Sequence, residues 1–277
     1  VIVVSAVNGV EPMTQRMMDF AKARGLCRLI VVNKIDTREA RTEQVLAELR
    51  ETFGKSCLPL NLPAAGGESV VDCFFQSQGV ATDFSSVATA HTEIIDQVVE
   101  VDEELMALYL EQGEELAPAQ LHDPFEKALR EDHLVPICFC SAETGAGISE
   151  LMRVLEKLAP NPTEGNPPTF LKGESADAVR VSVDPDPSKH VIAHVFKVTI
   201  DPFVGKLGIF RVHQGTVKAG AQLLVGDARK PIKIAHLFQL QGKEHVEVPQ
   251  AIPGDICAVP KIDELHFDAV LHDSHDE

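Results

Sequence analysis

The stretch Asn33-Lys34-Ile35-Asp36 contains the side chains with the clearest chemical use in this sequence. It follows residues 28–32, an apolar run that predicts a buried parallel strand, and ligands of open α/β sheets bind at the carboxyl ends of strands. The Asp36 carboxylate can accept two hydrogen bonds from the N–H edge of guanine, a pair of donors that adenine lacks. Asn33 can bond the other edge of the base, and the stem of Lys34 can cover its face. The alternative interpretation is an ordinary start of a helix, with Asp36 as its N-cap.

A second stretch, Ser141-Ala142-Glu143-Thr144-Gly145-Ala146-Gly147-Ile148, follows another predicted apolar strand at residues 135–140. A Ser-Ala turn at this place is typical of guanine-binding domains, where a backbone N–H points at the base carbonyl and small residues permit close approach. The alternative is an ordinary turn with glycines between a strand and a helix. Because both stretches stand between a predicted strand and a predicted helix, in the right order, we predict a guanine site that Ser141 and Ala142 close.

Two motifs that hold phosphate and metal in nucleotide-binding domains do not occur. The sequence contains no Gly-x-x-x-x-Gly-Lys-Ser/Thr, and no Asp-x-x-Gly precedes Asn33. The chain begins at Val1-Ile2-Val3-Val4, already inside a predicted strand. We therefore expect a fragment from which the first half of the nucleotide domain is missing.

Composition limits the class of protein. The 277 residues with 44% hydrophobic content are enough for two compact domains, and no apolar run approaches membrane-spanning length. The six cysteines lack paired metal-ligand spacing, so we expect buried free thiols, no metal site and a cytoplasmic location.

The net charge of −17 is unevenly distributed. Residues 83–132 hold fourteen acidic residues against two basic ones, a net charge of −12, whereas residues 189–255 hold nine basic against five acidic, a net charge of +4. The acidic segment is either a solvated face or a docking face for a basic partner. The mildly basic segment removes the objection that the overall charge raises against a nucleic-acid partner.

The hydrophobic pattern predicts α/β structure up to about residue 160. We expect a strand over residues 1–4, a helix from Pro12 to Gly25 that buries Met13, Met17, Phe20 and Ala21, a strand over residues 29–32 and a helix over residues 38–53. This alternation predicts a doubly wound parallel sheet from residues 1–54 and 134–160. Residues 55–133 are too long for a loop and predict an inserted subdomain, with a strand over 70–75 and helices over 92–110 and 124–130.

Beyond a Pro-rich linker at residues 161–168, the pattern changes to β. Strands are predicted over residues 191–200, 206–212, 222–225 and 232–238, with glycines between them. Short strands separated by regular turns predict a small barrel or sandwich for residues 169–277.

This second part carries a family resemblance. Residues 194–206, with Asp201-Pro202-Phe203-Val204-Gly205, and residues 210–220 closely resemble the second domain of bacterial elongation factor G, and so does the turn Pro253-Gly254-Asp255-Ile256. The first part agrees in order and spacing through residues 9–12, 33–36, 67–75, 102–110 and 141–147. The resemblance covers nearly the whole chain.

The resemblance implies a partial P-loop-type GTPase domain with an inserted α+β subdomain, followed by a β-barrel. It implies a parent protein that binds GTP or GDP with Mg²⁺, hydrolyses GTP on the ribosome and promotes tRNA–mRNA translocation. Asp36 would fix guanine specificity, Asn33 would hold the base and the loop, and Lys34 would cover the ring. Without the phosphate loop, the switches and the magnesium ligands, this chain is predicted to be catalytically inactive.

The resemblance also implies partners. The barrel would contact RNA of the small ribosomal subunit and the acidic insertion would contact the stalk protein of the large subunit. Strand edges left uncovered predict self-association. The sequence departs from the family at Ile35, where the family usually has methionine, at Thr37, where it often has arginine, and in a shorter segment between Phe75 and Thr92. The parent protein could therefore be a paralogue that recycles ribosomes or has another role. A ribosome-binding module without a nucleotide response is a further alternative.

Overall fold

The computed structural model describes residues 1–112, 120–166, 168–173, 178–201, 205–242 and 244–274, and the chain divides into two compact units, residues 1–160 and 161–277. The first is a parallel α/β unit and the second an antiparallel β unit, which confirms the predicted fold class. In the described part of the chain, no helix has both the length and the apolar character needed to cross a membrane.

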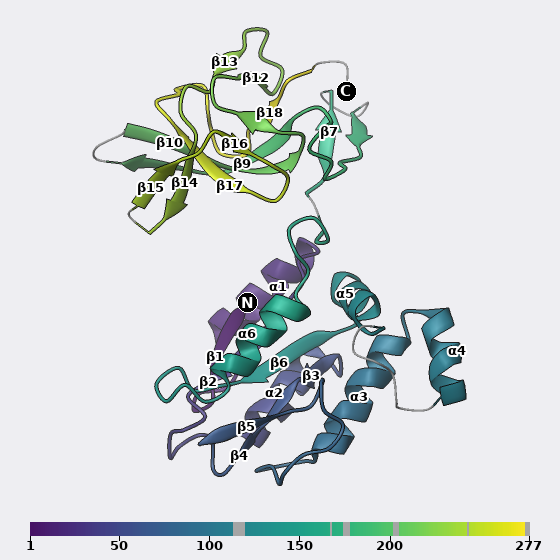
Figure 1. Cartoon of the computed structure of the whole chain (residues 1–277). Coiled ribbons are helices and arrows are strands. Elements are labelled where there is room, and N and C mark those ends of the chain that lie inside the picture. Colours follow the sequence, from purple (N-terminus) through teal and green to yellow (C-terminus); the bar gives the residue numbers. More distant parts are fainter. Residues whose placement is uncertain (113–119, 167, 174–177, 202–204, 243, 275–277) are drawn as a thin grey trace. The chain divides into compact units, whose positions relative to one another are not determined.

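The first unit is built around a parallel sheet with the strand order β1-β2-β6-β3, which Figure 1 shows flanked by helices. The sheet strands are β1 (Ile2–Ser5), β2 (Ile30–Asn33), β3 (Cys57–Pro59) and β6 (Val135–Phe139), and the helices next to them in sequence are α1 (Pro12–Ala23), α2 (Thr42–Phe53) and α6 (Ile148–Lys157). Strand β6 is buried along its whole length, and only Asn33 of β2 is not buried, because both strands are internal and covered on both faces.

Strand β3 corrects the expected boundary of the insertion at residue 55. It pairs in parallel with β6, with Cys57 opposite Val135, and all three of its residues are buried. The sheet therefore continues to residue 59 before the chain leaves it. The sequence does not predict this strand, because three residues are too few to show a periodic pattern.

The segment after β3 packs onto the same hydrophobic core as the sheet. It forms the hairpin β4 (Asn61–Ala64) and β5 (Ser69–Asp72) and the helices α3 (Val87–Val99), α4 (Glu103–Gln112) and α5 (His122–Arg130). The predicted helix over residues 92–110 is two helices, because Asp102 separates them and its carboxylate accepts a hydrogen bond from the Leu105 backbone N–H at 2.9 Å.

The buried face of α1 differs from the predicted one. Met18 and Thr14 are buried, whereas Met13 is 59% and Phe20 48% exposed. Apolar residues lie on both faces of this helix, so their spacing alone does not identify the core face. The edge strand β1 likewise leaves Val3 exposed.

The second unit contains an eight-stranded sheet in the order β13-β12-β18-β9-β10-β17-β14-β15, in which all neighbouring strands are antiparallel. Its strands are β9 (Ile192–Asp201), β10 (Gly205–Gln214), β12 (Gln222–Val225), β13 (Ile232–Lys233), β14 (Phe238–Gln241), β15 (Glu244–Glu247), β17 (Ile256–Pro260) and β18 (Val270–His272). Smaller pairings join β7 (Phe170–Lys172) to β8 (Val179–Val181) and β11 (Val217–Lys218) to β16 (Gln250–Ala251).

The core of this unit is apolar and includes Val195, Phe210 and Cys257. The strand predicted over residues 232–238 is divided between β13 and β14, which pair with different neighbours. Residues 202–204 of the turn that carries the family resemblance lie outside the described residues.

Candidate functional site

The two stretches singled out in the sequence meet at one edge of the parallel sheet. Strands β2 and β6 are neighbours in parallel register, with Val32 opposite Phe139, so their carboxyl ends lie side by side. Asn33 is the last residue of β2, and Ser141 follows β6 after one intervening residue. The fold therefore places both predicted motifs where ligands of open α/β sheets bind.

The side chain of Asn33 joins the two motifs. Its Oδ1 atom accepts hydrogen bonds from the backbone N–H of Lys34 at 2.8 Å and of Ala142 at 2.9 Å. With Oδ1 engaged in this way, the amide Nδ2 of Asn33 is the group that can donate to a base. The Ala142 N–H therefore donates to Asn33 rather than being free for a ligand in this structure.

The backbone after Asn33 is held in an unusual conformation. Lys34 has a φ of 70°, in the left-handed region that residues with a Cβ rarely adopt. Thr37 supports it, because its Oγ1 donates to the Lys34 carbonyl at 3.0 Å. Non-glycine residues in this region concentrate at functional sites, where surrounding contacts hold them.

Asp36 is not the N-cap of the following helix. Helix α2 begins at Thr42 with Arg41 as its N-cap, and Asp36 lies in the turn between β2 and α2 with its side chain partly exposed. The alternative interpretation of Asp36 as a capping residue is therefore wrong. Its carboxylate is instead placed in the turn that follows Asn33 and Lys34.

The turn from Ser141 to Gly147 is tightly closed on itself. Ser141 is fully buried, its Oγ accepts from the Thr144 N–H at 3.1 Å, and its own N–H donates to the Ala146 carbonyl at 2.8 Å. Gly147 has a φ of +74°, and a Cβ there would lie 2.4 Å from the Phe139 carbonyl oxygen. Ser141 thus shapes the turn from inside, while Ala142 is exposed at its surface.

Comparisons with known protein families give the site its context. The profile of the elongation factor Tu GTP binding domain matches residues 1–161, which is more than half of the chain. The chain belongs to this family of GTP-binding domains. The profile of elongation factor G domain 2 matches residues 190–272, within the antiparallel unit.

Individual relatives agree with these profiles. An elongation factor G-like protein of Thermotoga maritima is 28% identical over 276 residues, which cover 95% of this chain and 39% of that protein. A protein of Thermus thermophilus with a crystal structure is 29% identical, with a TM-score of 0.76 over 98% of this chain and 40% of that one. The chain thus spans about two fifths of the length of these relatives.

Sequence reasoning misses two polar side chains that support the backbone next to the two predicted motifs. Asn61 is buried and exchanges hydrogen bonds with the backbone of Phe139, at 3.0 Å to its carbonyl and 2.7 Å from its N–H. Asp83 accepts from the N–H groups of Gly66 at 2.9 Å and Gly67 at 3.0 Å. The glycine pair predicts a turn, but no local pattern indicates that Asn61 and Asp83 support the backbone near the two predicted motifs.

Two buried thiols lie at the carboxyl end of β6, Cys138 within the strand and Cys140 directly after it. Burial raises the pKa of Cys138 to about 12 and also raises that of Cys140, so both are protonated at neutral pH. The Cys140 thiol lies 3.9 Å from Asn33 Oδ1, and the Cys140 carbonyl accepts from the Ile35 N–H at 3.4 Å. Within the described residues, no group of three His, Cys, Asp or Glu side chains is arranged to hold a metal ion.

Proposed function

We propose that the edge formed by Asn33, Lys34, Asp36, Ser141 and Ala142 binds the guanine base of GTP or GDP. Asp36 accepts the two hydrogen bonds of the guanine N–H edge, Asn33 donates from Nδ2, and the Lys34 stem lies over the ring. The observation that carries the proposal is the bond from Ala142 N–H to Asn33 Oδ1 at 2.9 Å, because it joins the two predicted motifs into one edge.

The parent protein, in this proposal, is a ribosome-dependent translational GTPase of the elongation factor G type that promotes tRNA–mRNA translocation. The match to elongation factor G domain 2 supports this assignment. A paralogue with a ribosome-recycling or other role is the second candidate, and the relative described as an elongation factor G-like protein favours it.

Titration of the 277-residue chain with nucleosides tests the proposal. Base contacts without a phosphate loop are expected to give a Kd for guanosine on the order of 1 mM, about −4 kcal/mol. Shifts of the backbone amide resonances of residues 33–36 and 141–146 measure it, with adenosine as the control. Equal shifts with adenosine, or no shifts with guanosine at about ten times the expected Kd, contradict the proposal.

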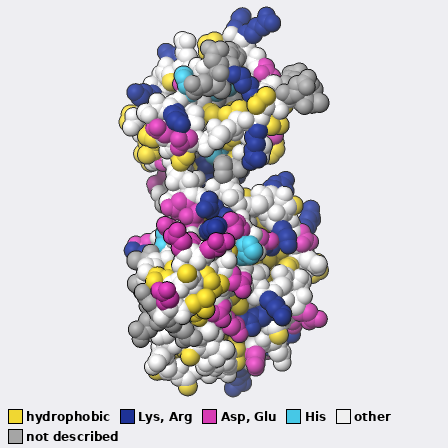
Figure 2. All heavy atoms as spheres, turned by 90° about the vertical axis from the view of Figure 1, so that its right-hand side faces the viewer, with side chains coloured by type: hydrophobic (Ala, Val, Ile, Leu, Met, Phe, Trp, Pro, Cys, Tyr) yellow, Lys and Arg dark blue, Asp and Glu magenta, His cyan; other side chains and the backbone are white. Residues whose placement is uncertain are grey.

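We further propose that the barrel unit contacts ribosomal RNA of the small subunit and that the acidic insertion contacts a basic face of the large-subunit stalk protein. Figure 2 looks onto the side that faces right in Figure 1, and acidic side chains gather there on the first unit. Some of these acidic residues hold other parts of the chain, and others are exposed without such a contact in the described part of the chain.

Several acidic residues of the insertion have structural partners, and three of them lie on or next to α3 and α4. Glu93 forms an ion pair with Arg50 at 2.7 Å, Asp96 accepts from the Tyr109 hydroxyl at 2.9 Å, and Asp102 caps α4. Glu103 and Glu104, in contrast, are exposed in the first turn of α4. They are the residues best placed to attract a basic partner.

Reversing the charge of both Glu103 and Glu104 to lysine is therefore expected to slow association with the stalk protein about tenfold at low salt, because electrostatic attraction acts chiefly on the association rate. Stopped-flow measurements over a salt series check this. Glu51→Lys with Glu156→Lys, at two exposed glutamates elsewhere on the first unit, changes the net charge equally and serves as control. If both double variants slow association alike, the acidity of the insertion has no docking role.

A further inference from the structure

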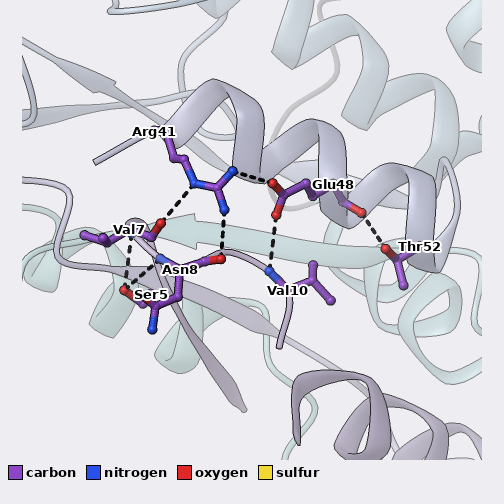
Figure 3. Close-up of polar contacts among 7 residues, drawn as sticks. All are labelled: Ser5, Val7, Asn8, Val10, Arg41, Glu48 and Thr52. Carbon is purple, nitrogen blue, oxygen red and sulfur yellow. Dashed lines mark hydrogen bonds and ion pairs between the residues drawn. The ribbon is translucent and has the colours of Figure 1, made fainter. Parts of the chain in front are cut away.

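The loop between β1 and α1 is fastened to α2 by an ion pair that the guanine proposal does not use (Figure 3). Arg41 donates from Nε to the Val7 carbonyl at 2.9 Å and from Nη2 to the Asn8 carbonyl at 2.8 Å. Its Nη1 pairs with Glu48 Oε1 at 2.6 Å, and Glu48 Oε2 accepts from the Val10 N–H at 3.3 Å. We call Arg41 and Glu48 the loop clamp, because both side chains hold loop backbone as well as each other.

Gly9 permits this close approach. It is buried with a φ of +76°, and a Cβ at this position would lie 2.1 Å from Glu48 Oε2 and 2.9 Å from Arg41 Nη2. A residue with a Cβ would be strained in this left-handed conformation, and the ends of the Glu48 and Arg41 side chains would have to move. The clamp and the loop therefore fit each other closely rather than meeting by chance at the surface.

The clamp is connected to the base-binding edge through Ala6. The Arg41 backbone N–H donates to the Ala6 carbonyl at 3.0 Å, and the Ala6 N–H donates to the Asn33 carbonyl at 2.8 Å. Ala6 is fully buried, and Ser5 is paired with Asn33 in the sheet register. Asn33 in turn holds Ala142 through Oδ1. A path of hydrogen bonds thus runs from the Arg41 backbone through Ala6 to Asn33 and on to Ala142.

The loop clamp holds the loop chiefly through its hydrogen bonds to backbone groups and less through the attraction between its two charges. The side chains of Arg41 and Glu48 are 37% and 34% exposed, so solvent screens much of their mutual attraction. Hydrogen bonds from a guanidinium to two carbonyls of the same loop are stronger than neutral ones and fix its geometry. The three donors of a lysine are on a single nitrogen, which cannot occupy the positions of the three guanidinium nitrogens of Arg41.

We propose that Arg41 and Glu48 are positioning residues for guanine recognition, acting through Ala6 on Asn33. This inference rests on the proposed function of the base-binding edge. Its alternative is a structural role only, in which the clamp closes the loop and the start of α2 without affecting Asn33.

Amide hydrogen exchange of the 277-residue chain, measured by NMR, separates the two roles without any ligand. The readout is the exchange of the Lys34 and Ala142 amides, both of which donate to Asn33 Oδ1, relative to the Ile137 amide within β6. Arg50→Ala is the matched control, because Arg50 also lies on α2, pairs with a glutamate and donates to a carbonyl, that of Cys57 at 3.1 Å.

Arg41→Ala is expected to speed exchange at Ala142 about tenfold relative to Ile137, the effect of losing a charged hydrogen bond, and Arg50→Ala is expected to leave the ratio unchanged. If Arg41→Ala does not fold, Arg41→Lys and Glu48→Gln are expected to give the same change to a smaller extent. Equal exchange ratios in these variants and in Arg50→Ala overturn the proposal.

Nucleoside titration completes the test. Arg41→Ala is expected to reduce the ratio of guanosine to inosine affinity several-fold, because a displaced Asn33 misplaces the base relative to Asp36. A wild-type chain that binds no guanosine refutes the proposed function, whereas the exchange ratio still decides whether the clamp positions Asn33. If Arg41→Ala keeps the nucleoside selectivity of the wild type and its amide exchange ratio is unchanged, the inference about the loop clamp is wrong, whereas the proposed guanine site is unaffected.

Discussion

Replacing Asp36 with asparagine is expected to shift the base preference of the chain from guanine to xanthine. The carboxylate is an acceptor for both N–H groups on one edge of guanine, whereas the asparagine amide offers one acceptor and one donor. Xanthine has a carbonyl where guanine has the exocyclic amino group, so it matches that amide. Each hydrogen bond to a charged group contributes about 1.5–3 kcal/mol, so the preference is expected to change by at least about tenfold.

Titration of the wild type and of Asp36→Asn with guanosine and with xanthosine measures this preference. Asp36 lies in a turn with its side chain partly exposed, and α2 begins later at Thr42. The variant is therefore expected to melt at the wild-type temperature, which makes the ratio of the two affinities interpretable. Glu39→Gln, an exposed neighbour in the same turn region, is the control and is expected to change nothing. An unaltered preference in Asp36→Asn would remove Asp36 from the proposed site.

The residues at the carboxyl ends of β2 and β6 could be predicted from sequence because local patterns define them. Each follows a continuous apolar run that is buried in the sheet, and each precedes a helix. This pattern alone assigns Asn33 and Ala142 to the same edge of a parallel sheet. The strand pairing between β2 and β6 then brings them into contact at 2.9 Å.

The contacts that support this edge could not be predicted in the same way. Asp83 and Gly67 are 16 residues apart, and neither periodicity nor a motif links them. Arg41 and Glu48 follow the ordinary pattern of a charged helix surface, and only the fold shows that they hold the loop before α1. Local sequence therefore predicts which residues lie at the carboxyl ends of β2 and β6 more readily than which residues hold them there.

Two features of the secondary structure also could not be predicted from local sequence, the short strand β3 and the break between α3 and α4. Strand β3 has three residues, too few for an alternating pattern, so the sequence places it in the insertion instead of the sheet. The break between α3 and α4 depends on one capping side chain, Asp102, within a continuous helical pattern. For β3 the pairing with β6 decides where there is no periodic signal, and at Asp102 a single hydrogen bond interrupts a periodic one.

Gly67→Ala is expected to cause the largest loss of stability and of guanosine binding among single substitutions near the site. Gly67 lies in the turn between β4 and β5 with a φ of +83°, and a Cβ there would lie 2.0 Å from the Ile35 carbonyl oxygen. That atom belongs to the backbone between Lys34 and Asp36, so no side-chain rotation relieves the overlap. Either the turn or the base-binding edge must move.

The neighbouring glycine provides a matched control. Gly66 has a φ of +69°, and a Cβ there would meet nothing within 4 Å. Gly66→Ala therefore carries only the cost of a left-handed conformation with a Cβ, about 1–2 kcal/mol. Gly67→Ala has the same conformational cost and in addition the overlap with the Ile35 carbonyl. We expect it to lower the free energy of unfolding by about 3–5 kcal/mol, as severe substitutions do. Both N–H groups donate to Asp83, so the two variants share their remaining contacts.

Urea unfolding and guanosine titration of the two variants measure both effects. We expect Gly66→Ala to keep the guanosine affinity of the wild type, since its added methyl group points into open space. We expect Gly67→Ala to lose it even under conditions where the chain is still folded, because the Ile35 carbonyl is displaced together with Asn33 and Asp36. If Gly67→Ala is destabilised but binds guanosine as Gly66→Ala does, the turn yields to the overlap and does not support the base-binding edge.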